Sequence, residues 1–325
     1  MKKYIAILLV AAMATLGISA CRKENSNKET KVQKDSDIKV VTTIFPEYDW
    51  VRQIAGEEAD QMDITMLLDN GVDLHSYQPT AEDIMKVSDC DLFVYVGGES
   101  DAWVDDALKQ TKNKDMQVVN LLDVLGNSVK EEEVIEGMEP EEEEEEPEYD
   151  EHVWLSVKNA EVLSKAIADA LEKADPDHKD IYQENASAYS EKLKDLDVKY
   201  QEVVVGASQK TLLFGDRFPF RYLVDDYGLS YYAAFVGCSA ESEASFDTIS
   251  FLANKVDELG LKDIMAIENS NQKIAKTIIE NTKEKNQKIL TLDTMQSTTS
   301  DDVKNGTTYL SVMEKNLEVL KEALQ

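Results

Sequence analysis

The strongest constraint on the fold is an alternation of short apolar runs with helix-like stretches, which occurs twice along the chain. In the first half, the strand-like runs are residues 39–44, 63–68, 92–96 and 116–122, and the helix-like stretches are 48–55, 80–87 and 102–109. In the second half, the strand-like runs are residues 211–214, 229–234, 263–267 and 288–292, and the helix-like stretches are 221–227, 245–259, 272–285 and 308–324. Short apolar strands separated by helices are typical of a parallel sheet covered on both faces. We therefore predict an α/β protein with two similar lobes, each a parallel sheet with flanking helices.

A long helix is predicted to join the two lobes. Residues 156–173 have a helical period that ends at Asp175-Pro176, and residues 178–204 contain neither Gly nor Pro. A helix over residues 178–204 would be about 40 Å long. The predicted domains are thus an N-terminal lobe at 38–174, a connecting helix at 175–206 and a C-terminal lobe at 207–325. Ligands of open α/β sheets bind beyond the carboxyl ends of the strands, so a site in the cleft between the lobes is expected.

The N-terminal 37 residues are predicted to lie outside the fold. Lys2 and Lys3 precede an apolar run at residues 4–18, which is too short to span a membrane comfortably. The run ends in Ser19-Ala20-Cys21, which resembles a lipobox, the signal that makes the cysteine the lipidated first residue of the mature protein. The alternative is an ordinary signal peptide with an incidental cysteine. We predict a signal peptide at 1–21, a flexible tether at 22–37 and an exported protein anchored by lipid to the outer face of the cell membrane.

The charge balance narrows the class of ligand. The chain has 65 acidic and 34 basic residues, for a net charge of −31, which argues against nucleic acid and favours a cation. An unbroken glutamate run at 141–146 lies within a predicted acidic insertion loop at 130–151. Blocks of like charge repel one another and stay unfolded. This loop either collects cations near the cleft or is a solvated insertion with no specific role.

Cysteine and histidine are scarce, with three of each. Besides Cys21, Cys90 and Cys238 are available to pair in an exported protein, although we favour two free thiols. The absence of a Cys-x-x-Cys motif argues against a thiolate metal site. His75 and His152 each lie at a transition from strand to helix, whereas His178 begins the connecting helix. A single loop histidine is more often a surface residue than a ligand, but neutral imidazole binds zinc and other late transition metals well.

Several motifs resemble those of the metal-binding solute-binding proteins of ABC importers, in the zinc- and manganese-specific cluster A-I. The segment Gly-Val-Asp-Leu-His-Ser-Tyr-Gln-Pro-Thr at 71–80 resembles a loop of that family that carries a histidine. Asp-Glu-His-Val-Trp-Leu at 150–155 resembles a second, and the family often has a His-rich or acidic loop just before it. Residues 40–46, 95–98 and 309–324 resemble its first strand, the element after its third strand and its C-terminal helix.

The resemblance implies one ion held between the lobes by four ligands. Two of the family's ligand positions match His75 and His152, and the carboxylate after the last strand matches Asp293. The remaining position, a His or Glu at the end of the first strand of the C-terminal lobe, falls on Gly215, and we take Asp216 as the substitute. Asp216 and Asp293 have an alternative role as helix caps. Glu268 and Glu243 are second-rank metal candidates.

The implied function is capture of a divalent transition metal and its delivery to the permease of an ABC importer, by a monomer that is not an enzyme. Zn²⁺ is the expected ion, and Mn²⁺ is a close alternative because two histidines and two aspartates form a comparatively hard ligand set. The sequence has no G-x-S-x-G, H-E-x-x-H or P-loop motif. Two alternatives remain: a metal-dependent hydrolase that uses His75, His152 and Asp293, and a surface lipoprotein that acts as an adhesin.

Overall fold

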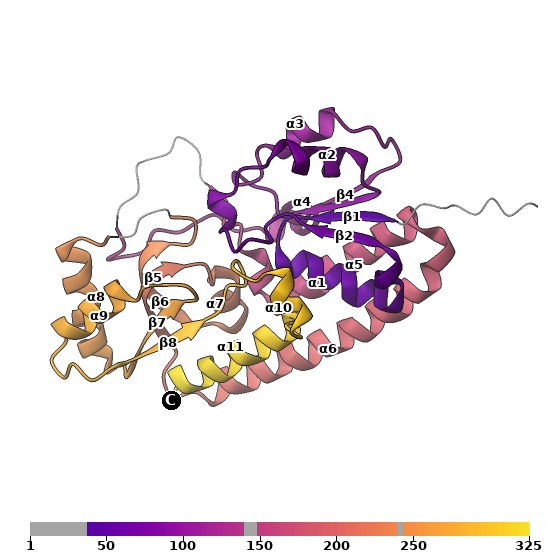
Figure 1. Cartoon of the computed structure of the whole chain (residues 1–325). Helices are drawn as coiled ribbons and strands as arrows, with labels where there is room; N and C mark the ends of the chain where they lie inside the picture. The colour runs from indigo at the N-terminus through magenta and orange to yellow at the C-terminus, as the bar shows by residue number, and fades with distance from the viewer. Residues whose placement is uncertain (1–37, 140–147, 240–242) are drawn as a thin grey trace, which may run out of the picture. The chain divides into compact units, whose positions relative to one another are not determined.

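The fold is seen in a computed structural model that describes residues 38–139, 148–239 and 243–325 (Figure 1). The strands are β1 (Lys39–Thr42), β2 (Asp63–Met66), β3 (Leu92–Tyr95), β4 (Gln117–Asn120), β5 (Thr211–Phe218), β6 (Ser230–Val236), β7 (Asp263–Ile267) and β8 (Lys288–Leu292). The helices are α1 (Phe45–Ala55), α2 (Ala81–Asp89), α3 (Val104–Lys109), α4 (Leu121–Leu125), α5 (Val157–Ala174), α6 (Lys179–Gly206), α7 (Arg221–Tyr227), α8 (Phe246–Leu259), α9 (Lys273–Asn281), α10 (Ser300–Lys304) and α11 (Tyr309–Ala323). Each predicted strand is confirmed. The predicted signal peptide, the tether and Cys21 lie outside the described residues.

The two lobes contain sheets of the same topology. The N-terminal sheet has the order β2-β1-β3-β4 and the C-terminal sheet the order β6-β5-β7-β8, with neighbouring strands parallel. In each sheet the chain crosses from one side of the first strand to the other, which creates a topological switch point beside that strand. Ligands bind at such points, beyond the carboxyl ends of the strands. The predicted α/β class with two similar lobes is therefore confirmed.

Helices cover both faces of the N-terminal sheet. Helices α1 and α5 contact each other and pack on one face, while α2 and α3 lie on the other (Figure 1). Strand β3 is buried along its whole length, which explains why it reads as a continuous apolar run. Thr80 caps α2, because its side chain accepts the backbone N–H of Asp83. The local signals in the sequence thus agree with the tertiary packing.

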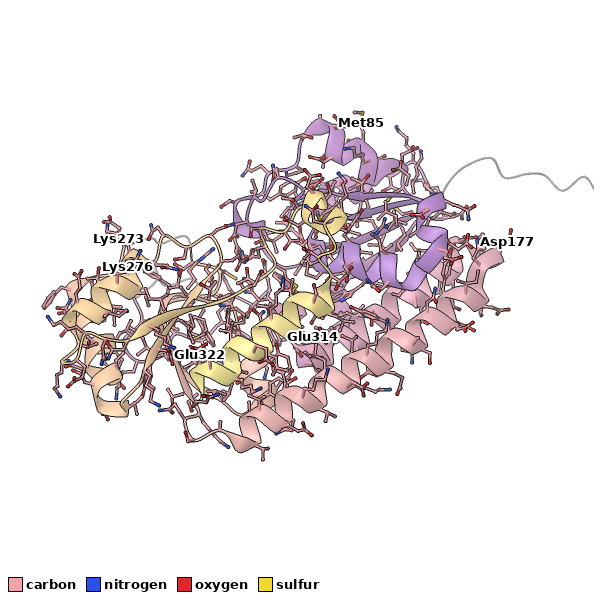
Figure 2. All side chains as sticks on the ribbon, turned by 60° about the horizontal axis from the view of Figure 1, so that its bottom comes forward. Met85, Asp177, Lys273, Lys276, Glu314 and Glu322 are labelled. Carbon is pink, nitrogen blue, oxygen red and sulfur yellow. The ribbon has the colours of Figure 1, made fainter. Side chains whose placement is uncertain are left out.

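The connecting helix α6 has 28 residues and is therefore about 42 Å long. It packs on α1 and α5 from the N-terminal lobe and on α11 from the C-terminal lobe. Helix α11 is amphipathic: Met313 and Leu320 are buried, while Glu314 and Glu322 are exposed and are labelled in Figure 2. Because α11 also contacts α1, it ties the end of the C-terminal lobe to the first helix of the N-terminal lobe.

The acidic insertion is better anchored than its composition predicts. The glutamate run at 141–146 lies outside the described residues, but the segments on either side form an antiparallel bridge between Glu131 and Tyr149. The backbone N–H of Glu139 donates to the carbonyl of Ala234 on β6 at 2.9 Å, and Lys130 pairs with Asp225 of α7 at 2.8 Å. The ends of the insertion thus pack on the C-terminal lobe.

A buried carboxyl on α1 gives the fold a pH dependence. Asp49 accepts the backbone N–H of Tyr309 at 2.9 Å and the amide of Gln53 at 3.1 Å, and burial outweighs both bonds and raises its pKa from 3.8 to about 6. The folded protein therefore holds this proton more tightly than the unfolded chain. The resulting stability is fully present below about pH 4 and is lost as the pH rises through about 6, a change of about 3 kcal/mol.

Asp49→Asn cannot ionise, so the variant is expected to lose less stability than the wild type between pH 4 and pH 7. Urea unfolding of both proteins across this range measures the difference. Other buried acids titrate equally in both proteins, so the difference isolates Asp49. Parallel stability curves for the two proteins would contradict this account.

Within the described residues, no helix combines the length and the apolar character needed to cross a membrane.

Candidate metal centre

The two loop histidines that the sequence singles out lie side by side. The Nε2 atoms of His75 and His152 are 3.2 Å apart, and the ring centroids are 5.1 Å apart. His152 is fully buried, and 12% of the His75 side chain is exposed. Two nitrogen ligands at 2.0–2.1 Å from a tetrahedral zinc ion would be about 3.3 Å apart. The spacing of the pair therefore suits a shared metal ion.

An aspartate two residues before each histidine fixes its backbone. The backbone N–H of His75 donates to Asp73 Oδ1 at 3.0 Å, at the start of a short 3-10 helix, Leu74–Ser76. The backbone N–H of His152 donates to Asp150 Oδ1 at 2.8 Å, just before a second such helix, Val153–Leu155. The pattern Asp-x-His thus occurs twice with the same local geometry, and this signal is visible in the sequence.

The second nitrogen of each ring faces an acceptor. His152 Nδ1 lies 3.0 Å from Asp150 Oδ1, and His75 Nδ1 lies 2.9 Å from Ser100 Oγ and 3.5 Å from Glu151 Oε2. Metal-binding histidines usually donate this second N–H to a carboxylate or hydroxyl, which leaves Nε2 free to bind the ion. With both Nδ1 atoms protonated, the two Nε2 lone pairs face each other, and a cation between them removes their repulsion.

The surrounding charges act in opposite directions on the two rings. Burial and the neighbouring His152 lower the pKa of His75, which keeps that ring neutral and able to bind a metal. Burial also opposes protonation of His152, but the hydrogen bond to Asp150 and the charges of Asp150, Glu132 and Glu151 outweigh it and raise the pKa. Without a metal, a proton on His152 can occupy the space between the two Nε2 atoms. The acidic groups that favour this proton also favour a divalent cation.

Residues of the C-terminal half hold the His152 loop in place. The indole N–H of Trp154 donates to the carbonyl of Thr294 at 2.8 Å, and Trp154 packs against His152 with ring centroids 5.2 Å apart. The amide of Gln296 joins both histidine loops: its Oε1 accepts the N–H of Leu74 at 3.3 Å, and its Nε2 lies 3.4 Å from His152 Nε2. Sequence reasoning did not identify Gln296, since a single glutamine in a loop gives no signal.

The predicted carboxylate ligands are engaged in other contacts. Asp216 Oδ1 accepts the N–H of Arg217 at 3.0 Å, and its Oδ2 is buried without a hydrogen-bond partner. Asp293 Oδ1 accepts the N–H of Met295 at 2.8 Å. Glu268 accepts both the N–H and the hydroxyl of Thr294, and Glu243 is exposed and pairs with Lys273 at 3.2 Å. Their role as ligands therefore remains a prediction.

Gly215, where the resemblance implies a ligand, has no room for a side chain. A Cβ placed there would come within 2.5 Å of Ala275 Cα, because α9 packs directly against β5. Strand β5 extends past the predicted end to Phe218, with an irregular register between Phe214 and Arg217. Asp216 does not cap the next helix, because Phe220 occupies that position without a side-chain bond.

The structure brings a cysteine to the histidines that sequence reasoning did not assign to the site. The ligand atoms of His75, His152 and Cys238 all lie within 4.8 Å of one another, and among the described residues they form the one such group of three or more His, Cys, Asp or Glu. Cys238 follows β6 at its carboxyl end, and both Cys90 and Cys238 are free thiols, as we favoured. The three candidate ligands are thus two imidazole rings from the N-terminal half and one thiol from the C-terminal half.

A pocket of about 420 Å³ opens beside this centre at the carboxyl ends of the C-terminal strands. Its lining includes Asp73, Asp216, Arg217, Glu268 and Gln296. Arg217 pairs with Asp73 at 2.7 Å and so joins β5 to the loop that carries His75. The pocket therefore lies where the topology predicts a ligand site.

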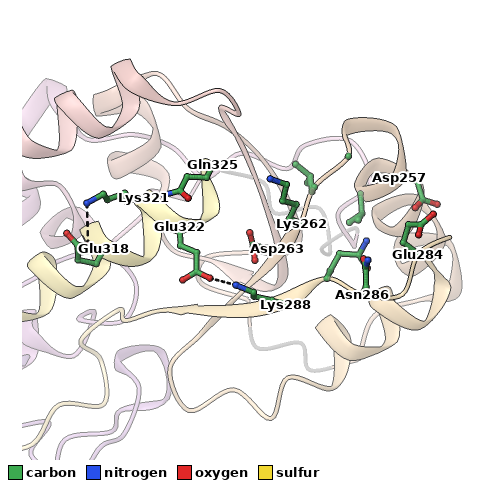
Figure 3. Close-up of a pocket in the computed structure, with 14 residues that line it drawn as sticks. Asp257, Lys262, Asp263, Glu284, Asn286, Lys288, Glu318, Lys321, Glu322 and Gln325 are labelled. Carbon is green, nitrogen blue, oxygen red and sulfur yellow. Dashed lines mark hydrogen bonds and ion pairs between the residues drawn. The ribbon is translucent and has the colours of Figure 1, made fainter.

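A larger pocket, of about 770 Å³, lies at the amino-terminal ends of strands β7 and β8 in the C-terminal sheet (Figure 3). It is lined by Asp263 and Lys288, the first residues of β7 and β8, and by residues of α11, with an ion pair between Lys288 and Glu322 at 2.6 Å. A second ion pair in the lining joins Lys321 and Glu318 at 3.7 Å, and the pocket lies at the amino ends of the strands. We therefore place the functional site at the histidine pair rather than in the larger pocket.

Comparison with known proteins identifies the family of the chain. The sequence model of the family described as zinc-uptake complex component A, periplasmic, matches residues 40–323. The chain is 35% identical over 319 residues to the zinc-binding lipoprotein AdcA of Streptococcus pneumoniae, covering 97% of this chain but 60% of AdcA. It is 30% identical to the high-affinity zinc uptake system protein ZnuA of Bacillus subtilis, covering 99% of this chain and 98% of that protein.

Solved structures show the same fold. The Zn(II)-bound ZnuA-like domain of Streptococcus pneumoniae AdcA superposes with a TM-score of 0.69 at 31% identity, covering 89% of this chain and 99% of that domain. The chain thus spans about 60% of the length of the full AdcA protein and nearly all of its ZnuA-like domain. Because the family model covers almost the whole described fold, this chain belongs to the family of the periplasmic component A of zinc-uptake complexes.

Proposed function

We propose that this chain captures a zinc ion between His75 and His152 and delivers it to an ABC importer in the membrane. The observation that carries the proposal is the 3.2 Å separation of the two Nε2 atoms, which equals, within about 0.1 Å, the ligand spacing of a tetrahedral zinc ion. Both rings are held by hydrogen bonds before the ion arrives, so little side-chain entropy is lost on binding. The zinc-bound relative of the same fold supports the choice of ion.

The centre suits capture and release rather than catalysis. His152 is fully buried, and contacts from Trp154, Gln296 and Asp73 span the two lobes around the ion site. A rearrangement of these contacts would release the ion to a partner. We keep the prediction that the chain is not an enzyme and acts as a monomer. We also propose that the protein is exported and lipid-anchored through Cys21, in line with its relative named a lipoprotein.

Calorimetric titration tests the proposal directly. The purified protein is expected to bind one zinc ion, and competition with manganese decides between the two candidate metals. Zinc at one hundred times its dissociation constant is expected to add about 2.7 kcal/mol to the free energy of unfolding. Absence of saturable zinc binding would refute the proposal. Metal-dependent hydrolysis of a small ester, amide or phosphoester would instead favour the hydrolase alternative.

A further inference from the structure

The histidine pair supplies two donors, whereas protein zinc sites have three or four protein ligands. A third metal ligand must therefore approach the Nε2 atoms from another part of the chain. Within the described residues, Cys238 is the remaining His, Cys, Asp or Glu whose ligand atom lies within 4.8 Å of the ligand atoms of both histidines. In a tetrahedral zinc site, the distance between a nitrogen ligand and a sulfur ligand is about 3.6 Å, so a small movement of the thiol completes the site.

We infer that Cys238 is the third protein ligand and binds the captured ion as a thiolate together with His75 and His152. This inference rests on the proposed function and specifies the donor set. When the ion binds, the S–H bond breaks, a sulfur–metal bond forms and the proton leaves to solvent. The site is then a His₂Cys centre with a fourth position, for which Asp293 remains our candidate.

The backbone around Cys238 is built for close approach to the rings. A Cβ on the preceding Gly237 would lie 3.1 Å from His152 Nδ1 and 3.0 Å from the carbonyl of Phe218, so a larger residue would crowd the ring. The backbone N–H of Cys238 donates to Glu132 Oε1 at 2.9 Å, which attaches this turn to the anchored end of the acidic insertion. The lack of a side chain at Gly237 lets this turn approach His152 closely, and the bond to Glu132 fixes the backbone of Cys238 there.

A second, independent observation points to a cation at the same place. Glu151 is buried, with 3% of its surface exposed, and its Oε2 has no hydrogen-bond partner although it lies 3.5 Å from His75 Nδ1. A buried carboxylate oxygen without a donor is costly unless positive charge lies nearby. A divalent ion on the neighbouring rings supplies that charge, and it also offsets the thiolate.

The thiolate changes the expected metal preference. Soft sulfur ligands favour zinc over manganese, which prefers carboxylate and water. A His₂Cys site is therefore expected to reject manganese more strongly than the His₂Asp₂ set predicted from the sequence.

Cobalt(II) provides a direct probe because a cobalt–thiolate bond produces a charge-transfer absorption band in the near ultraviolet. The wild-type protein is expected to develop this band in proportion to cobalt, up to one equivalent. Cys238→Ser should lose the band. Cys90→Ser is the matched control, because Cys90 is buried at the amino end of β3, where its thiol donates to the carbonyl of Val87. That variant should retain the full band.

Zinc affinity gives the second measurement. Cys238→Ser is expected to weaken zinc binding by more than the roughly 10–100-fold that is typical when a metal ligand loses its hydrogen-bond partner, while manganese binding changes less. Wild-type protein that binds one cobalt ion without a sulfur band would overturn the role of Cys238 but leave zinc capture intact. Wild-type protein that binds neither metal would refute the proposed function itself. Because the spectrum of the wild type decides the issue, a misfolded variant would not obscure the result.

Discussion

Replacing His152 by alanine is expected to remove nearly all of the stabilisation that zinc gives the protein. The ring is fully buried, its Nε2 lies 3.2 Å from that of His75, and its Nδ1 is already held by Asp150. Its loss leaves His75 without its partner ring. At a zinc concentration one hundred times the wild-type dissociation constant, the wild type gains about 2.7 kcal/mol, and the variant should gain close to none.

His178→Ala is the matched control for this experiment. His178 is the third histidine of the chain; 42% of its side chain is exposed, and it pairs with Asp175 at 2.6 Å just before α6. Its removal should leave the zinc-dependent shift in melting temperature unchanged. The melting temperature of each variant should be measured both with and without zinc, because loss of a buried ring lowers stability on its own. A full zinc shift in a His75→Ala, His152→Ala double variant would show that the proposed site is wrong.

Trp154→Ala is expected to have the largest effect on stability among the substitutions near the site. Trp154 is fully buried between His152 and the C-terminal helix, where its carbonyl accepts the hydroxyl of Tyr309 at 2.7 Å. Truncating such a side chain creates a cavity and typically costs 3–5 kcal/mol. The lost indole N–H also leaves the carbonyl of Thr294 without its donor. Denaturant unfolding of the metal-free protein measures the total.

Trp50→Ala separates the effect of the cavity from the effect on the site. Trp50 of α1 is equally buried and packs edge-on against Tyr309 with ring centroids 5.2 Å apart. We expect a stability loss of the same size, about 3–5 kcal/mol, but no loss of zinc affinity in the folded protein. Trp154→Ala should weaken zinc binding as well, because the His152 ring loses the surface that orients it. Equal zinc affinities for the two variants would contradict this role of Trp154.

The sequence predicted the strands and the longer helices because their signals are local. Strand β3 is buried on both faces and so is apolar throughout, and α6 lacks any residue that would end a helix early. Helices α4 and α10 were not predicted, since each has five residues and too few turns to show a period. The end of β5 was placed too early because Gly215 and Asp216 interrupt the apolar pattern of a strand.

The two histidines were predictable from their motifs, and the Asp-x-His pattern explains why both rings are rigidly placed. Cys238 was not predictable, because a single cysteine 86 positions after His152 carries no spacing signal and its proximity depends on how β6 packs beside the N-terminal lobe. Asp216 was chosen for its position in the sequence, and the structure shows that its neighbour Gly215 faces α9. Sequence position alone does not reveal which side chains reach the cleft.

The anchored ends of the acidic insertion illustrate the same limit. The composition of residues 130–151 predicts a solvated loop whose like charges repel one another. The side chains of Glu132 and Glu139 nevertheless accept the backbone N–H groups of Cys238 and Ser245. These bonds form because the two lobes meet beside β6, a contact that no local pattern encodes. A charged residue of the insertion, Glu132, can therefore attach to the turn that carries Cys238.

Anomalous diffraction at the zinc edge from crystals of the zinc-loaded protein tests the central claim most directly. The account predicts one strong peak about 2.0–2.1 Å from Nε2 of both His75 and His152 and about 2.3 Å from the sulfur of Cys238. A zinc peak bound elsewhere, with the two histidine rings bonded only to protein or solvent, would contradict it.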